Sequence, residues 1–480
     1  MKLRRFVVIG GGISGLAAAH RLAELRRANP DLWTITLLEA SERLGGVIHT
    51  QRADGVLLEG GPDAFLTEKP WAVELCRRLG LGPELLETNP RCRRSFILRR
   101  GKPVAIPEGW HLLAPASLAT LLLAPLLSWR GRIRMAGEAF VPRRRDEEDQ
   151  SVGSFIRRRF GQEALARIGQ PMLSAIYAAD PDALSLRSTM PRFHALEQRH
   201  GSILRGLRAE TGEQSAATQQ ASGPRYSLFA TLRGGLSTLV DAIARDMPEV
   251  SVRCGSPVAR LIPGETWTVI LQNGQLLEAD AVCLALPAPQ AASLIAPVSP
   301  DLAQALSAIT YESVATANLI FRREGLPRLP DGFGLIVPAI ERRRLIGVTF
   351  ASQKFPGRAP EDAVLIRAFL GGSSDREAAA LNDAALTTLV QEELRALLGI
   401  RTPPARVTIH RHPQAMPQYR VGHLGRVARI ESLAARQPGF WLIGNAYHGI
   451  GIPDCIHQAE LSAERMAAWA QQAAPGATSA

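Results

Sequence analysis

Apolar and polar positions near the N-terminus follow a pattern that predicts a strand, a helix and a second strand. Residues 6–9 form a short apolar run before a glycine-rich turn, and residues 16–25 repeat small and aliphatic side chains at helical spacing. Residues 33–40, "WTITLLEA", then form an apolar strand that ends at Glu39. Together these segments predict a βαβ unit, the repeating element of a doubly wound parallel sheet.

Later apolar runs predict that the chain returns to this sheet twice. A strand at residues 250–253, a hairpin that turns at Asn273-Gly274 and a buried strand near residues 281–286 form the first return. The strand "GFWLIGN" and the Ala- and Leu-rich helix that follows it form the second. Between the two returns, residues 315–413 mix strands with a helix, which predicts a separate antiparallel-sheet α+β domain.

Residues 110–129 are strongly apolar, but Pro115 and Pro125 interrupt any continuous helix there. A membrane span is therefore disfavoured against two alternatives, a helical lid buried against the second domain and an apolar surface that seats the protein on a membrane. Residues 151–184 read as helices, so this region predicts a helical insertion. The polar, low-complexity residues 211–223 predict an exposed loop.

The charge balance favours an anionic partner. Lysine and arginine number 56 against 45 acidic residues among 480, a net charge of +11, which suits a phosphate-bearing cofactor, a carboxylate-rich substrate or an acidic membrane face. Nucleic acid is disfavoured because no recognition motif is visible and aromatic residues make up only 5%. Five scattered cysteines without a C-x-x-C pair indicate no metal site and, with no signal peptide visible, favour a reducing cytoplasm.

Three glycines, Gly10, Gly12 and Gly15, form a G-x-G-x-x-G motif directly after the first strand and before the helix. The first allows a tight turn, the second lets a pyrophosphate approach the backbone, and the third lets helix and strand pack closely. Glu39, at the end of the second strand, is placed to accept hydrogen bonds from ribose hydroxyls. The motif predicts a dinucleotide site; the alternatives are a plain glycine-rich turn and a charged strand end that faces water.

A second glycine-punctuated run, "GNAYHGIGIPDCIHQAE", precedes the C-terminal helix at residues 444–460. One βαβ unit cannot hold both ends of a long dinucleotide, so this run is predicted to hold the far end, which is the flavin ring if the dinucleotide is FAD. Residues 449–451 permit close backbone approach, and the N–H groups that open the helix favour the negative charge of a reduced flavin. The alternative is a helix-capping turn with Asp454 as the cap, and both interpretations can hold together.

Further motifs carry a resemblance to a known family. Arg43, Gly45 and Gly46 resemble the R-x-G-G segment of amine-oxidase-like flavoproteins. Seven stretches, in order from residue 7 to residue 456, are similar to the oxygen-dependent porphyrinogen oxidases, which use FAD to oxidise protoporphyrinogen IX or coproporphyrinogen III. The stretches are "VVIGGGISGLAAAHRL", "LLEASERLGGVIHT", "GGPDAFLTEKP", "SAIYAADPDALSLRSTMPRFHALEQRHGSILRGL", "GFGLIVP", "PQAMPQYRVGH" and "GNAYHGIGIPDCI". The runs "IYAADPDALS" and "MPQYRVGH" distinguish this family from its relatives.

The patterns and the resemblance together predict an α/β plus α+β architecture. A Rossmann-type FAD-binding domain is expected from residues 1–85, 228–290 and 425–475, and an antiparallel-sheet substrate domain from residues 86–109, 191–227 and 291–424. The helical insertion is expected at residues 110–190. The resemblance implies FAD contacts at Gly10, Gly12, Ile13, Ser14, Gly15, Glu39, Ala40, Arg43, Gly45, Gly46, Gly61, Pro62, Asp63, Ala64, Val258, Gly444, Ile450, Gly451 and Ile452.

The resemblance also implies a reaction, the six-electron oxidation of a porphyrinogen to a porphyrin in haem biosynthesis, with oxygen as acceptor and hydrogen peroxide as product. Coproporphyrinogen III is favoured because the loop with Lys69 and the run "GIGIPDCI" resemble the bacterial enzymes that act on it. Substrate contacts are implied at Lys69, Arg94, Ala175 and Tyr177. Ala175 and Ala179 replace the family's usual glycines, and Ser95 replaces an arginine of several relatives, so a propionate clamp is either Arg94 or absent.

Several alternatives stay open at this stage. No catalytic acid or base is predicted, and His448, near the proposed flavin turn, fits a structural role better than proton transfer. Rival functions are a protoporphyrinogen IX oxidase, an amine oxidase, a carotenoid desaturase and a flavin-free scaffold. An amine oxidase should show two aromatic side chains flanking the flavin, and only Tyr447 is obviously placed for one. A tetrapyrrole and oxygen are the expected partners of a cytoplasmic protein, with peripheral contact to the inner membrane face left open.

Overall fold

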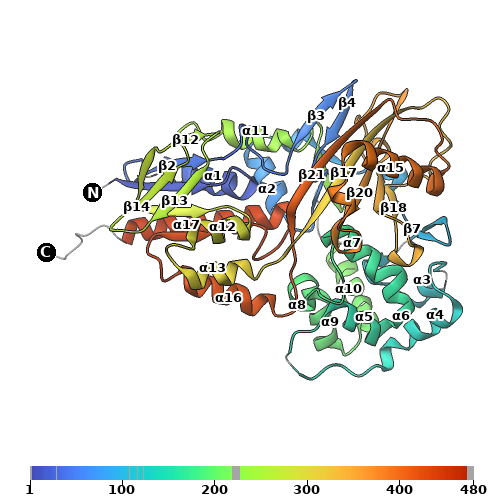
Figure 1. Cartoon of the computed structure of the whole chain (residues 1–480). Coiled ribbons are helices and arrows are strands. Elements are labelled where there is room, and N and C mark those ends of the chain that lie inside the picture. Colours follow the sequence, from blue (N-terminus) through green and yellow to red (C-terminus); the bar gives the residue numbers. More distant parts are fainter. Residues whose placement is uncertain are drawn as a thin grey trace.

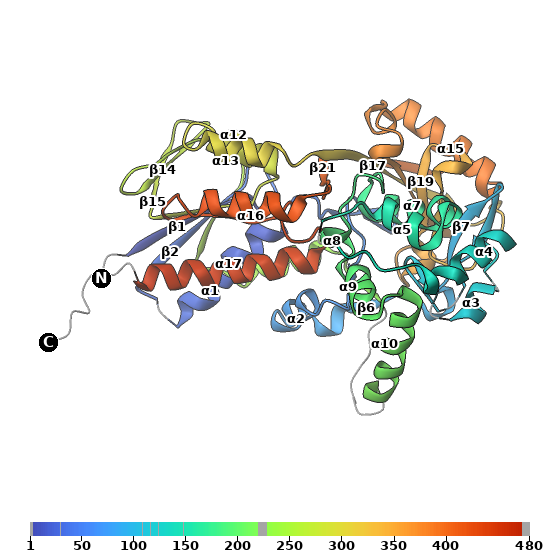
Figure 2. The same ribbon diagram turned by 90° about the horizontal axis from the view of Figure 1, so that it is seen from below.

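The computed structural model describes residues 3–472 except residues 29, 108, 116, 123, 147 and 219–227. Figure 1 shows three parts: a parallel sheet with its covering layers, a larger sheet at the other end, and a group of short helices beside that larger sheet. Both described ends of the chain belong to the first part. In Figure 2 the first and last long helices, α1 and α17, run side by side there.

The parallel sheet is built from stretches that lie far apart in the sequence. Its strands, in spatial order, are β12 (Val250–Arg253), β2 (Trp33–Leu38), β1 (Arg4–Ile9), β16 (Ala281–Leu284) and β22 (Phe440–Leu442). Every neighbouring pair is parallel. The predicted returns of the chain to its N-terminal sheet are therefore confirmed, and the predicted α/β fold class with them.

Alternate residues of β1 face opposite sides of this sheet, and both sides are covered. Phe6 and Val8 pack against the helices α1 (Ile13–Arg27), α2 (Trp71–Arg78), α11 (Ser237–Arg245) and α17 (Ile452–Gln472). Val7 and Ile9 pack against an antiparallel sheet and three helices. These are β13 (Val258–Ile262), β14 (Trp267–Leu271), β15 (Leu276–Ala279), α12 (Ala288–Ile295), α13 (Pro300–Ser307) and α16 (His423–Ala434). The predicted Asn273-Gly274 turn joins β14 to β15.

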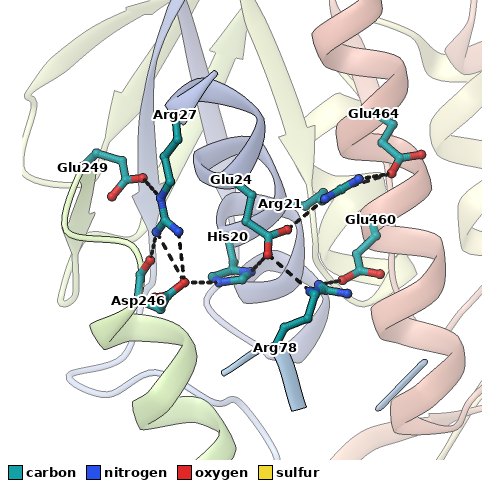
Figure 3. A network of polar contacts seen from close by, with 9 residues as sticks. All are labelled: His20, Arg21, Glu24, Arg27, Arg78, Asp246, Glu249, Glu460 and Glu464. Carbon is teal, nitrogen blue, oxygen red and sulfur yellow. Dashed lines mark hydrogen bonds and ion pairs between the residues drawn. The ribbon is translucent and has the colours of Figure 1, made fainter. Parts of the chain in front are cut away.

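A network of polar contacts, partly buried and partly exposed, ties the helices of the first face together (Figure 3). The imidazole of His20 on α1 lies 2.9 Å from the Asp246 carboxylate after α11. Arg21 on α1 donates to Glu464 on α17 across 2.7 Å, and Arg78 on α2 donates to Glu460. Because exposed ion pairs contribute little stability, we assign most of the stabilisation here to the apolar core beneath them.

The larger sheet has seven strands. In spatial order they are β21 (Arg406–Pro417), β17 (Tyr311–Arg322), β20 (Ala363–Gly371), β19 (Leu345–Phe350), β18 (Gly334–Ile336), β7 (Ser95–Arg99) and β8 (Lys102–Ala105). Helix α15 (Asp383–Leu398) covers one face. The predicted antiparallel character holds for every pair except β18 with β7, which is parallel. β7 enters this sheet from an earlier stretch of the chain, so its direction relative to β18 is not set by a hairpin.

Smaller strands connect the two sheets. They are β3 (Thr50–Ala53), β4 (Val56–Glu59), β5 (Phe65–Leu66), β6 (Leu85–Glu87) and β11 (Phe229–Leu232), with the short helix α14 (Ala351–Lys354) nearby. The side-chain amide of Asn318 on β17 donates to the Glu59 carbonyl at the end of β4 across 3.1 Å. The face of the larger sheet that α15 does not cover is thereby held against the loop that follows β4.

The third part is mainly helical. It contains α3 (Leu118–Leu122), α4 (Trp129–Ala136), α5 (Val152–Phe160), α6 (Gln162–Ala164), α7 (Gln170–Tyr177), α8 (Leu186–Thr189), α9 (Pro191–His200) and α10 (Ile203–Thr218). Phe193 on α9 and Leu204 on α10 are buried in the same apolar cluster as α5 and α7. The helical part therefore extends beyond the predicted boundary at residue 190.

Two local predictions in this part were wrong. Residues 110–115 form a small hairpin, β9 (Trp110–His111) with β10 (Ala114–Pro115), rather than a helix. Helix α10 continues to Thr218, so the predicted loop at residues 211–223 is helical as far as it is described, and residues 219–223 lie outside the described part. Good helix formers such as Glu213, Gln214 and Ala216 account for this continuation. Within the described residues, no helix is both long and apolar enough to cross a membrane.

Candidate functional site

The carboxyl ends of the parallel strands meet at one edge of the sheet, where the predicted site residues gather. Gly10 follows β1, Glu39 follows β2 and Gly444 lies just beyond β22. Chain order reverses next to β1, because β2 lies on one side of it and β16 on the other. Ligands of open α/β sheets bind in the crevice at such a switch point. The N-terminal and C-terminal glycine runs therefore share one edge, as predicted.

The three motif glycines are required for different reasons. A Cβ on Gly15 would lie 1.8 Å from the Gly10 carbonyl oxygen, and a Cβ on Gly10 would lie 2.4 Å from the Ala285 carbonyl oxygen. Neither clash is tolerable, so the fold itself demands these two glycines. A Cβ on Gly12 would meet no heavy atom of the described chain within 4 Å. Open space over Gly12 fits a ligand that approaches the backbone closely, as the pyrophosphate of FAD would.

Glu39 closes the other side of the glycine turn. One carboxylate oxygen accepts from the Gly11 N–H across 2.6 Å, and the other accepts from the Ser41 N–H across 2.8 Å and from its hydroxyl across 2.7 Å. The carboxylate thus faces the turn and does not simply project from a strand end into water. This position suits the predicted contact with ribose hydroxyls. Ala40, also a predicted contact, follows Glu39 directly, and the Ser256 N–H, two residues before the predicted contact Val258, donates to the Glu39 carbonyl.

The R-x-G-G segment packs directly on the first glycine turn. Gly45 pairs with Gly12 in a parallel bridge and donates from its N–H to the Gly11 carbonyl across 2.8 Å. Gly46 has a φ of +58°, and a Cβ there would lie 3.2 Å from the Gly12 Cα. The Arg43 guanidinium donates to the Gly46 carbonyl across 2.6 Å and to the Ile48 carbonyl across 3.0 Å. Arg43 therefore shapes the loop while remaining exposed at its rim.

The loop of residues 61–64 is anchored to the larger sheet through Asp63. Its carboxylate lies 2.9 Å from the Lys354 ammonium and 3.2 Å from the Arg367 guanidinium. Burial by itself raises the pKa of Asp63, but the two cations outweigh it and lower the pKa to about 2. Arg367 also donates to the Gly61 carbonyl across 2.6 Å. Because the Asp63 carboxylate is engaged in these ion pairs, the predicted flavin contact of this loop is left to its backbone.

The C-terminal glycine run leads directly into α17. Gly449 has a φ of +142°, and a Cβ there would lie 2.4 Å from the Asp454 carboxyl carbon. The Asp454 carboxylate accepts from the Lys69 ammonium across 2.6 Å. Lys69, predicted as a substrate contact, is thus paired at the N-terminal end of α17. Burial raises the pKa of the Cys455 thiol to about 12, and the Ser14 hydroxyl partly opposes this rise, so the first turns of α1 and α17 lie close together.

The remaining predicted substrate residues are not all brought together. Tyr177 ends α7 and donates from its hydroxyl to the Thr189 carbonyl across 3.2 Å. Ala175 is exposed on the same helix, and Ala178, next to Ala179, takes the left-handed conformation with a φ of +53°. Arg94 is exposed and precedes β7, near the opposite edge of the larger sheet from β21. The propionate clamp at Arg94 therefore stays a prediction from the resemblance.

A cavity of about 530 Å³ is lined partly by histidines that sequence reasoning missed. Its lining includes Arg43, Gly46, His49, His410, His412 and Asn445. Burial, followed by repulsion that protonated His49 and His412 would exert, lowers the pKa of His410 to about 4, and burial also lowers the pKa of His49 and His412. Three neutral imidazoles therefore face the cavity at pH 7. The two-residue spacing of His410 and His412 on a strand was the available signal, because such residues share one face.

His448 and Tyr447, in the C-terminal glycine run, both make contacts within the protein itself. The His448 imidazole lies 2.7 Å from the Glu431 carboxylate at the surface, which agrees with the structural role expected for it. Tyr447 is buried in the core between the parallel sheet and β14. Its ring is therefore not free to flank a flavin, which weakens the amine-oxidase alternative.

Comparisons with known proteins agree with this geometry. A protein-family profile described as "Flavin containing amine oxidoreductase" matches residues 13–467. The chain is 35% identical over 458 residues to the coproporphyrinogen III oxidase of Bacillus subtilis (strain 168), with 95% of this chain and 96% of that protein covered. It is 34% identical over 487 residues to the protoporphyrinogen oxidase of Bos taurus, with 96% and 98% covered. A crystal structure of a protein from Exiguobacterium sp. 255-15 superimposes with a TM-score of 0.85 at 32% identity, covering 97% of this chain and 99% of that one.

Proposed function

Because the chain belongs to the family of flavin-containing amine oxidoreductases, we propose that it oxidises a porphyrinogen to the corresponding porphyrin. It is an FAD-dependent oxidoreductase, and the similarity to porphyrinogen oxidases over nearly its whole length is the observation that carries the choice of substrate. The flavin-free scaffold loses its support, because the opening over Gly12 fits a bound dinucleotide.

FAD, when bound, supplies the redox chemistry by accepting a hydride from the substrate. The chain's own residues bind and orient it. Gly12 leaves room for the pyrophosphate, Glu39 offers a carboxylate to the ribose, and the N-terminal end of α17 presents a positive dipole to the flavin edge. An electron-rich flavin is favoured at such a helix end, and this is the electrostatic contribution that we assign to residues 450–452.

Coproporphyrinogen III is the substrate that we favour over protoporphyrinogen IX. It carries four carboxylates where protoporphyrinogen IX carries two, and the net charge of +11 suits the more acidic ligand. Lys69 contributes a cation at the N-terminal end of α17, although Asp454 neutralises part of its charge. Oxygen is the proposed acceptor. The loss of six electrons in two-electron steps then gives three molecules of hydrogen peroxide for each porphyrin.

The test adds coproporphyrinogen III and protoporphyrinogen IX separately to the purified, FAD-loaded protein under air. Porphyrin fluorescence and peroxide are followed together, with protein-free samples as the measure of autoxidation. We expect both substrates to give porphyrin above autoxidation, with the higher kcat/KM for coproporphyrinogen III. Fluorescence no faster than autoxidation with either substrate would refute porphyrinogen oxidation, and the reverse order of kcat/KM would refute the substrate preference.

We further propose that the helical part contacts an anionic membrane surface through α3, α4 and the residues that follow. Leu121, Leu126 and Leu127 are buried in the helical core, so most of the apolar segment at residues 110–129 serves internal packing. Four large apolar side chains nevertheless remain exposed close together in the sequence: Leu122 at 63%, Trp129 at 66%, Ile133 at 64% and Phe140 at 87%. The exposed Arg130 and Arg134 lie between them, which suits acidic lipid headgroups.

A further inference from the structure

Residues 417–423, from the last residue of β21 to the first residue of α16, carry the "PQYRVGH" part of a run that the proposed reaction does not use. At its centre Tyr419 is buried, with 2% of its surface exposed. The Tyr419 hydroxyl donates to the Asn445 carbonyl across 2.7 Å and accepts from the Gly449 N–H across 2.8 Å. One buried hydroxyl therefore bridges the two ends of the turn that leads into α17.

The Tyr419 ring is itself held in place. It stacks on the His423 imidazole with ring centroids 3.9 Å apart and an angle of 13° between the planes. His423 is fully buried, and its Nε2 lies 3.1 Å from the Tyr447 carbonyl oxygen. Burial lowers the pKa of His423 to about 4, so the ring is neutral at pH 7 and donates this hydrogen bond from Nε2–H. Together the two rings bind three backbone groups of residues 445–449.

The same short segment also binds the turn that follows α7. The side-chain amide of Gln418 donates to the Tyr177 carbonyl across 3.1 Å. The Tyr419 carbonyl accepts from the Ser185 N–H across 2.8 Å, and the Val421 N–H donates to the Ala183 carbonyl across 3.0 Å. Residues 417–423 thus contact the "IYAADPDALS" run on one side and the C-terminal glycine run on the other.

We propose that Tyr419 is a positioning residue that holds the turn of residues 445–449 in the shape needed for the flavin. Gln418, by the same geometry, links this turn to the residues beside the substrate. The Gly449 backbone, at a φ of +142°, takes a conformation that few residues other than glycine adopt. Since the hydroxyl is buried, a phenylalanine at position 419 leaves the Gly449 N–H and the Asn445 carbonyl without a partner. The link to substrate rests on the proposed function, whereas the contact with the turn does not.

The central experiment compares Tyr419→Phe with Tyr311→Phe. Tyr311 is a matched control because its hydroxyl also accepts from a backbone N–H, that of Ala288, across 2.9 Å, but on α12 rather than on the turn. Apoprotein is titrated with FAD, and the quenching of flavin fluorescence gives Kd. At saturating FAD, dye-equilibration titration gives the flavin reduction potential. We expect Tyr419→Phe to raise Kd about 10- to 100-fold and to shift the potential, while Tyr311→Phe changes neither.

Unchanged Kd and potential in a folded Tyr419→Phe protein, checked by circular dichroism and thermal melting, would overturn the proposal. If that variant does not fold, His423→Phe gives the same comparison, because it keeps an aromatic ring under Tyr419 and removes the bond to the Tyr447 carbonyl. The same rise in Kd is expected there, and a wild-type Kd would again overturn it. These measurements need no porphyrinogen, so failure of the proposed reaction is distinguishable from failure of this role.

Gln418→Leu tests the link to the substrate side. It removes the bond to the Tyr177 carbonyl and leaves the Tyr419 hydroxyl intact, so we expect KM for coproporphyrinogen III to rise several-fold while Kd for FAD stays at the wild-type value. A rise in Kd without a change in KM would overturn this part of the proposal.

Discussion

Glu39 accepts a hydrogen bond from the Gly11 N–H across 2.6 Å, which fastens the end of β2 to the glycine turn after β1. Two neighbouring parallel strands are thereby joined at their carboxyl edge, where the cofactor crevice opens. The carboxylate thus has a role in the protein's own turn, beside the proposed contact with the ribose. Both roles bear on the first prediction.

Replacing Glu39 with alanine should raise the Kd for FAD about tenfold or more, because both the ribose contact and the partner of the Gly11 amide are lost. Flavin-fluorescence quenching on titration of the apoprotein measures this. Glu42→Ala is the control, since this exposed carboxylate follows in the same loop. Equal affinity of the Glu39→Ala and wild-type proteins would remove Glu39 from the nucleotide site.

Replacing Gly12 with alanine should impair FAD binding, whereas replacing Gly15 with alanine should impair folding. At Gly12 the protein has room for the methyl group, and the backbone φ of −70° suits alanine, so the apoprotein should fold normally while FAD retention drops. At Gly15 the methyl group would lie 1.8 Å from the Gly10 carbonyl oxygen, so folding itself should suffer. Thermal melting of the apoproteins and the flavin content after purification separate the two. A Gly12→Ala protein that keeps a full complement of FAD would contradict the role assigned to the open space.

Asp63 should make stability depend on pH in acid. Its pKa in the folded protein is about 2, below the ordinary value of 3.8. Its ion pairs therefore stabilise the folded protein at pH values above 3.8, and this stabilisation is lost as the pH falls toward 2. Asp63→Asn should therefore lower the free energy of unfolding at pH 7 by about 2 kcal/mol, and the difference from wild type should shrink in acid. Urea denaturation at a series of pH values measures it.

The matched control for Asp63 is Asp54→Asn, which breaks the exposed pair of Asp54 with Arg406. Exposed pairs contribute little, so this variant should stay close to wild type throughout. An Asp63→Asn protein whose difference from wild type is the same at pH 7 and in acid would exclude the ion pairs as its cause.

Membrane contact should depend on the apolar side chains of α4. The double variant Trp129→Ser with Ile133→Ser removes two exposed side chains and should reduce the fraction of protein that sediments with anionic phospholipid vesicles by about tenfold. Leu276→Ser, at an exposed leucine of β15, is the control and should not change it. Co-sedimentation of wild type that is weak, or equal with zwitterionic and anionic vesicles, would argue against an anionic membrane partner.

Much of the dinucleotide site was predictable because its signals are local. Gly15 and Glu39 are specified by contacts within one βαβ unit, and such contacts leave a spacing that can be read along the chain. Gly10 was readable from the same motif, although the atom that excludes a side chain there is the distant Ala285 carbonyl oxygen. The second glycine run was also readable, because Gly449 precedes a helix and takes a conformation that favours glycine. The helical extension to Thr218 was not, since a polar composition is compatible with both a loop and an exposed helix.

The cavity histidines and the substrate side were less predictable for a different reason. His49 comes from the first part of the chain, whereas His410 and His412 lie on the edge strand of the larger sheet. Lys69 was expected to meet substrate, and the fold pairs it with Asp454 from the C-terminal helix. No pattern within either stretch indicates the partner, because each contact joins residues hundreds of positions apart.

By itself the sequence determined most of the strand and helix types, the glycine turns and the family, since these follow from periodicity, backbone freedom and motifs that each lie within a few tens of residues. Only the tertiary structure decided which stretches share an edge, which charges are already paired and where open space remains. Those properties depend on burial and on distances between segments, and the chain acquires them when the apolar faces of its separate parts pack together. Tyr419 shows the difference. The sequence places it in a run typical of the family, but its hydrogen bonds to the turn before α17 exist only in the folded protein.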